Sequence, residues 1–253
     1  MNIPRRAWTE FARKLAAVNE TAAQLMWEWL KVNGTGNLEA AVQYAFALAE
    51  TYGEAAAALA CEMYDAAALF YGVTVPPATP ADGPVEERLR AAIEKAVEEA
   101  PVTIPAIVGR TVKQQAADTT LQNAQRDGAE WAWVPNGDTC AFCITLASNG
   151  WQHQSKAAKR AHAEHIHNNC DCTYAVRFSK KDGVEGYDDQ VYKDMYYNAS
   201  ESQNPKDKIN AMRRENYETD ERLRAQKHEY YEAHKETLKA KREAKLAGEN
   251  NEA

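Results

Sequence analysis

The stretch "WTEFARKLAAVNETAAQLMWEW", residues 8–29, indicates how the N-terminal half of the chain folds. Its apolar side chains recur at alternating spacings of three and four residues, which places one face of an α-helix on Trp8, Phe11, Leu15, Val18, Ala22, Leu25 and Trp29. Residues 33–36, "NGTG", then interrupt the helix, and Asn37 is a suitable N-cap for a second helix from residue 38 to about residue 71. We therefore predict an antiparallel helical hairpin over residues 1–71, because each apolar face needs a partner.

The next segment, residues 72–84, reads "GVTVPPATPADGP" and predicts a proline-rich linker. Its prolines and glycines are incompatible with a helix or a central strand. Apolar spacing then predicts a third helix over about residues 85–100 and a fourth over about residues 106–127. Gly128 stands at the position where glycine commonly ends helices.

The sequence pattern changes after Gly128. Residues 130–134, "EWAWV", alternate in the manner of a β-strand, and residues 172–178 predict a second strand. We assign residues 85–178 to helices followed by a small Cys/His module, and we expect an α+β fold that is mostly α. Residues 179–253 carry many charges of both signs and few aliphatic side chains, so they predict a charged helical or partly disordered tail. A short helix is expected within residues 207–218.

Composition limits the classes of function. The formal net charge of −7 argues against a protein that binds nucleic acid over its whole surface. No apolar run approaches the length of a membrane span, and the first residues do not resemble a signal peptide, so we expect no membrane partner. In a reducing cytoplasm, cysteines at close spacing more often bind a metal than form a disulfide.

Four of the five cysteines fall in two short motifs, "CAFC" at residues 140–143 and "HNNCDC" at residues 167–172. Thiolates and imidazole are the ligands that a structural Zn²⁺ prefers, and a C-x-x-C turn offers two sulfurs to one ion. Four of five candidates would supply the tetrahedral ligands: Cys140, Cys143, His167, Cys170 and Cys172. The sequence leaves open which four, and an alternative is a set of reduced thiols without metal.

Catalytic interpretations fit this cluster less well. A zinc deaminase carries H-x-E before P-C-x-x-C, whereas here "HAE" at residues 162–164 follows the C-x-x-C motif. A zinc-supported nuclease or other DNA-modifying enzyme remains an alternative, and so does an internal DNA-binding protein. Trp131, Trp133 and Asp138 are predicted to belong to the core of the module, with a base-stacking surface as the alternative for the two tryptophans.

Residues 105–178 as a whole resemble the phage Mu F-like minor head protein family. The resemblance rests on a helix with an Arg-Thr pair and a later asparagine, a tryptophan strand, an aspartate before C-x-x-C, and a final H-x-x-C-x-C-T. Here these positions are Arg110, Thr111, Asn123, Trp131 or Trp133, Asp138, Cys140, Cys143, Leu146, Gly150, His167, Cys170, Cys172 and Thr173. Two departures stand out: residues 147–149 read "ASN" in place of an acidic segment, and Asn168 replaces a common proline.

The resemblance implies assembly rather than catalysis. Such proteins are minor capsid components of tailed phages that associate with the portal vertex and assist procapsid formation, DNA packaging or ejection. It therefore implies a non-enzymatic virion protein, made in the host cytoplasm, that binds the portal protein. Scaffold protein, major capsid protein and packaged DNA are further expected partners.

Overall fold

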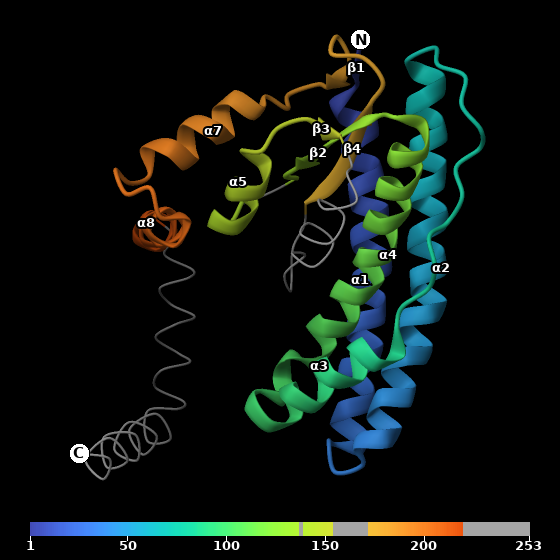
Figure 1. Ribbon diagram of the computed structural model, residues 1–253. Coiled ribbons are helices and arrows are strands. Elements are labelled where there is room, and N and C mark those ends of the chain that lie inside the picture. Colours follow the sequence, from blue (N-terminus) through green and yellow to red (C-terminus); the bar gives the residue numbers. More distant parts are fainter. Residues whose placement is uncertain (137–138, 154–171, 220–253) are drawn as a thin grey trace. The chain divides into compact units, whose positions relative to one another are not determined.

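The computed structural model describes residues 1–136, 139–153 and 172–219 (Figure 1). Two compact units are present, Met1–Met195 and a second that begins at Tyr196. The residues predicted as a hairpin, a linker and a Cys/His module all contribute to the first unit, apart from those outside the described ranges. The α+β, mostly α class is confirmed by long helices beside a small sheet.

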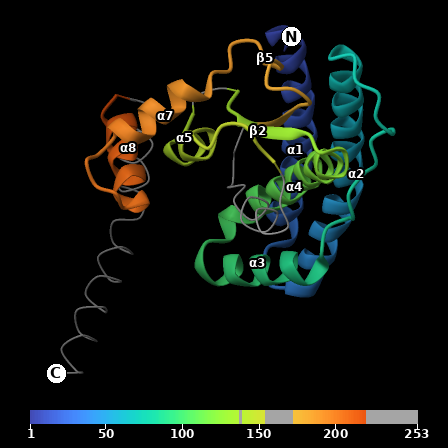
Figure 2. The ribbon, with the colours of Figure 1, turned by 45° about the horizontal axis from the view of Figure 1, so that its top comes forward.

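Three helices form the bundle of the first unit: α1 (Arg5–Asn33), α2 (Leu38–Phe70) and α4 (Ile104–Asp127). Helix α4 lies along both others (Figures 1 and 2). Helix α1 buries most of the predicted apolar face, with Trp8, Phe11, Leu15 and Ala22 in the core. The Asn37 side chain accepts a hydrogen bond from the Ala40 amide and caps α2 as expected.

The buried face of α2 consists mainly of alanines rather than of its bulky side chains. Ala41, Ala45, Ala56 and Ala60 are at most 1% exposed, whereas Leu69 is 82% exposed. Small side chains let neighbouring backbones approach closely, so this face suits a helix that packs against two partners. Helix α3 (Glu86–Glu99) and the 3₁₀ turn η1 (Pro101–Thr103) complete the helical part before α4.

Residues 72–84, predicted as a linker, are bound along α4, and we call them the strap. The Asn123 amide donates to Thr79 O at 2.8 Å and accepts from Thr79 N at 3.0 Å. Arg126 donates to the carbonyls of Pro76 and Pro77 at 2.7 and 2.9 Å. The absence of regular structure was predicted correctly, but these hydrogen bonds make the segment part of the packed unit.

The sheet is antiparallel, in the order β3-β2-β4, with β2 (Glu130–Val134) at its centre. Its neighbours are β3 (Gln152–His153) and β4 (Thr173–Arg177), and the β2–β4 register runs from Glu130↔Arg177 to Val134↔Thr173. Both predicted strands are therefore present. A separate parallel pair joins β1 (Asn2–Ile3) to β5 (Gly183–Val184).

Helices α5 (Ala141–Ala147) and α7 (Asp189–Asn198) were not predicted, whereas α8 (Pro205–Thr219) matches the short helix expected within residues 207–218. In the second unit, the buried Lys208 ammonium donates to the carbonyls of Tyr197 and Ser200 at 3.1 and 2.6 Å. These bonds fix the start of α8 to the turn before it. Across the described ranges, no helix is long and apolar enough to cross a membrane.

Candidate metal centre

The first cysteine pair lies at the beginning of α5. Cys140 is the N-cap residue, and its carbonyl accepts the Ile144 amide at 3.0 Å. Cys140 is extended and precedes the helix, and Cys143 is the third residue of its first turn. The Cys143 side chain is 1% exposed and Cys140 is partly buried. The C-x-x-C motif thus spans the N-cap and the first turn of α5.

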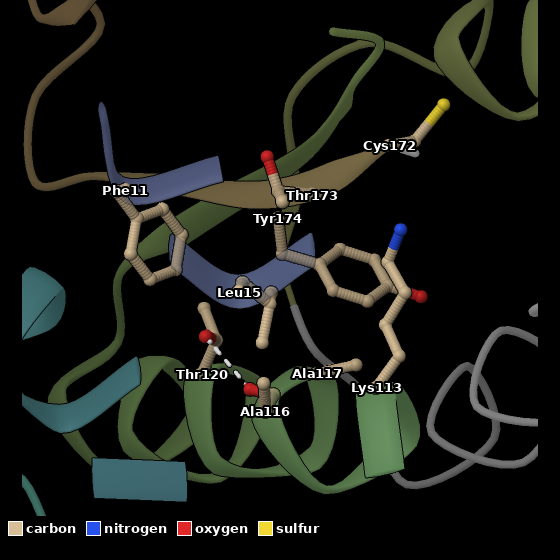
Figure 3. Close-up of a pocket in the computed structure, with 9 residues that line it drawn as sticks. All are labelled: Phe11, Leu15, Lys113, Ala116, Ala117, Thr120, Cys172, Thr173 and Tyr174. Carbon is tan, nitrogen blue, oxygen red and sulfur yellow. Dashed lines mark hydrogen bonds between the residues drawn. The ribbon is translucent and has the colours of Figure 1, made fainter. Parts of the chain in front are cut away.

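Cys172, the remaining motif cysteine among the described residues, immediately precedes β4. Thr173 is paired with Val134, the last residue of β2, and the chain runs from Val134 to Cys140 in six residues. Both cysteine segments therefore adjoin the same end of the antiparallel pair. Cys172 is fully buried, and in Figure 3 its side chain points away from Phe11 and Leu15.

By donor type these three cysteines suit zinc, since thiolates are preferred zinc ligands. The other two predicted ligands, His167 and Cys170, lie outside the described residues, as does Asp138. Within the residues that the structure describes, no group of three or more His, Cys, Asp or Glu side chains is arranged to hold a metal. Cys140, Cys143 and Cys172 are therefore not grouped as metal ligands in this structure, although they adjoin the same end of the sheet.

The aromatic side chains of β2 and β4 hold this end of the sheet against the bundle. Trp131 and Trp133 are 0% and 1% exposed. The Tyr174 ring meets both edge-on, with ring centroids 5.0 and 4.5 Å apart. Because both indoles are buried in this conformation, neither presents a face on which a nucleotide base could stack.

Tyr174 also reaches the helices. It lines a small cavity together with Phe11 and Leu15 of α1 and Ala116 of α4 (Figure 3). The tryptophan-bearing face of the sheet is thus anchored to the bundle rather than forming an independent core. The sequence analysis did not single out Tyr174, although its place opposite Trp133 follows from pairing the two predicted strands.

Sequence reasoning also missed an ion pair at the opposite end of the β2–β4 strand pair. Arg177 donates to Glu130 at 2.7 Å directly across the strands, and each side chain is 15% exposed. The Arg177 guanidinium also lies 4.6 Å from the centre of the Trp151 ring. Cross-strand charge pairing at positions 130 and 177 was the available signal.

Gly150, one of the positions in the family resemblance, adopts a φ of +64° after α5. A Cβ atom there would collide with the Asp189 carboxylate at the start of α7. Glycine is therefore required both by the backbone conformation and by the close approach of α7.

Comparison with known proteins gives one family. The model of the VG15 protein family matches residues 2–199. The chain belongs to the VG15 family, a family of phage gene products. Searches of curated proteins and of solved structures found no match.

The VG15 match begins in β1 and ends directly after α7. It therefore includes the bundle, the strap, the sheet and both cysteine motifs. The extent of the match agrees with the packing, in which helices and sheet share one core. Any function of the cysteine motifs should therefore be explained within the VG15 region, residues 2–199.

Proposed function

We propose that this VG15 protein is a minor capsid, or head morphogenesis, protein of a tailed phage that associates with the portal. The observation that carries the proposal is the phage family match over residues 2–199, which contains the C-x-x-C and H-x-x-C-x-C-T motifs. Their order and spacing resemble those of Mu F-like minor head proteins. The proposed role is non-enzymatic, and its location is the virion near the portal vertex.

The bundle offers a surface suited to such docking. An open groove runs between α1 and the beginning of α4, lined by Leu25, Trp27, Val102 and Pro105 among others. Trp27 is 40% and Val102 69% exposed, so both apolar groups are accessible to a partner. Large aromatic side chains in partly apolar grooves are common centres of protein–protein binding energy.

We propose a structural role for zinc in the same protein. Cys140, Cys143 and Cys172 would contribute three ligands, and His167 or Cys170 the fourth. Bound there, the metal would link the start of α5 to the start of β4 and so cross-link a region built from short elements. Scaffold protein, major capsid protein and packaged DNA are further proposed partners.

Copurification tests the proposal directly. Mass spectrometry of purified procapsids and virions should detect this chain in few copies, and immobilised portal protein should retain it. Trp27→Glu with Val102→Glu should weaken portal binding at least about tenfold, because each charge replaces an apolar side chain that the portal would bury.

Val32→Glu is the matched control, since Val32 is 84% exposed on the same helix and outside the groove. It should bind the portal like the natural chain. Absence from both particles together with no affinity for the portal would overturn the assignment. Cleavage of plasmid DNA with Mg²⁺, lost on His167→Ala, would instead support the nuclease alternative.

A further inference from the structure

A hollow separate from the cysteine motifs lies between α3, α4 and the end of the strap. Arg88 and the apolar Val85 and Ala92 line it from the α3 side. Arg110 and Gln114 line it from α4. The hollow thus combines two cationic side chains with an apolar wall and one carboxylate, that of Asp118. Neither the family match nor the proposed function assigns it a role.

Arg110 is the unusual member of this set. Its side chain is half-buried, and burial lowers the pKa of its guanidinium, which nevertheless stays charged at neutral pH. It makes no hydrogen bond or ion pair within the described part of the chain, and neither does Arg88 at the exposed rim. A cation removed from water without a partner is unfavourable, so an anion from outside would relieve a real free-energy penalty.

Two neighbouring polar groups already have hydrogen-bond partners within the chain. The Thr111 hydroxyl donates to Ile107 O at 2.9 Å, and the Gln114 amide donates to Asp118 at 3.0 Å. By contrast, Arg90 on the opposite side of α3 is paired with Glu39 at 2.7 Å and with Glu86 at 3.0 Å. Among the described residues, the fold thus pairs Arg90 with two carboxylates, whereas Arg110, which lines the hollow, forms no ion pair, not even with Asp118.

The surroundings select the class of anion. Helix α3 carries five acidic residues against three basic ones, so its surface repels an extended polyanion such as DNA. The apolar wall favours a ligand with hydrocarbon beside its charge, and a guanidinium binds a carboxylate through two parallel hydrogen bonds. We propose that Arg110, with Arg88 at the rim, binds the carboxylate of a single acidic side chain flanked by apolar residues in a partner protein.

NMR titration of the isotope-labelled full chain tests this site. The probes are two matched peptides, acetyl-Leu-Glu-Leu-amide and acetyl-Leu-Gln-Leu-amide, with the Arg110 Nε–H resonance as the reporter. The glutamate peptide should shift this resonance saturably and bind at least about tenfold more tightly than the glutamine peptide, as expected for hydrogen bonds between charged groups. Equal binding of both peptides, or no binding, would overturn the proposal.

Variants of Arg110 distinguish a binding role of this residue from a structural one. The reporters are the backbone amide resonances of the residues that line the hollow. Arg110→Gln should abolish the preference for glutamate, and Arg110→Lys should retain part of it, since lysine keeps the charge but loses the planar fork. Arg13→Gln, an exposed arginine on α1, should change nothing. Arg110→Gln should also melt no lower than the natural chain. A lower melting temperature would show an internal partner and contradict the proposal.

Inorganic phosphate forms the second arm of the titration. Phosphate should bind more weakly than the glutamate peptide in the same titration, because phosphate makes no contact with the apolar wall. Tighter binding of phosphate than of the peptide would overturn the carboxylate assignment in favour of a phosphate ligand.

Discussion

The helical bundle and the sheet share one core but are built from opposite kinds of side chain. The bundle helices are 24 to 33 residues long, and α2 contributes mostly alanine to the core. The β2 and β4 strands have five residues each and bury Trp131, Trp133 and Tyr174. Long helices gain stability from many small contacts, whereas short strands depend on a few large ones. Single substitutions should therefore have their largest effects in the sheet.

The largest effect is expected for the metal ligands. Cys143→Ser should reduce zinc from about one ion per chain to nearly none, because replacement of a thiolate removes a preferred ligand. Hydrogen exchange should then accelerate across residues 130–134 and 173–177 but not in the centre of α2. Elemental analysis and exchange mass spectrometry measure the two results.

Cys61→Ser is the matched control, since Cys61 lies in α2, away from both motifs. It should retain the zinc. Full metal loading of Cys143→Ser would contradict the proposed ligand set and leave the sheet to be stabilised by its aromatic contacts alone.

Removal of a sheet aromatic should have the next largest effect. Trp133→Ala should lower the free energy of unfolding by about 3–5 kcal/mol, because it leaves a cavity between β2, Tyr174 and the bundle. Trp27→Ala, at a half-exposed position of α1, should lower it by only about 0.5 kcal/mol. Urea unfolding monitored by circular dichroism compares the two variants. Similar losses would show that the contrast between sheet and helix surface is wrong.

Within the bundle, two glycines of the helix crossings should respond in opposite directions. A Cβ at Gly109 would lie 3.2 Å from Asn19 O and 3.4 Å from Ala23 Cβ, so Gly109→Ala should destabilise the fold by about 1–2 kcal/mol. At Gly53 the nearest atom would be Gln115 Cγ, at an ordinary 3.6 Å. Gly53→Ala should stabilise the fold by up to about 1 kcal/mol through helix propensity. Thermal melts of both variants decide whether α4 packs more tightly on α1 than on α2.

The smallest effect concerns acid stability where α4 ends. The hydrogen bond from Arg126, assisted by that from the Tyr64 hydroxyl, holds the pKa of Asp127 below its usual value. The carboxylate therefore stabilises the fold above roughly pH 4, and this contribution is lost as pH falls through the lowered pKa. Asp127→Asn should reduce stability by about 1 kcal/mol at pH 7 and by less at pH 3. Glu10→Gln, in an exposed pair, should leave the pH profile almost unchanged, and an unaltered profile in Asp127→Asn would refute the linkage.

Helices and the two longer strands could be predicted from periodicity because their patterns are local. Residues 130–134 match β2, and α2 ends within one residue of the expected position. The attachment of the strap to α4 could not be predicted from local patterns. It depends on hydrogen bonds from Asn123 and Arg126, which lie more than forty residues away in the sequence. Helix α5 was missed because seven residues are too few for an apolar period to emerge.

Part of the candidate metal centre could also be predicted from local sequence patterns. Spacing alone brought Cys140 and Cys143 together, and strand pairing brings Cys172 to the same end of the sheet. Arg110 could be named from the family resemblance, but whether a described residue pairs with it depends on how α3 crosses α4. The way these two helices cross cannot be predicted from periodicity or spacing in a single sequence.

The pairing of β1 with β5 sets a condition on how the protein is made. Ile3 is paired with Val184, and the Arg5 amide donates to the Glu185 carboxylate, so the first residues find their partners about 180 positions later. Contacts of such sequence separation form slowly because a long loop must close first. We therefore expect β1 to stay unpaired during synthesis until residue 185 has left the ribosome, and the bundle to fold before the unit is closed.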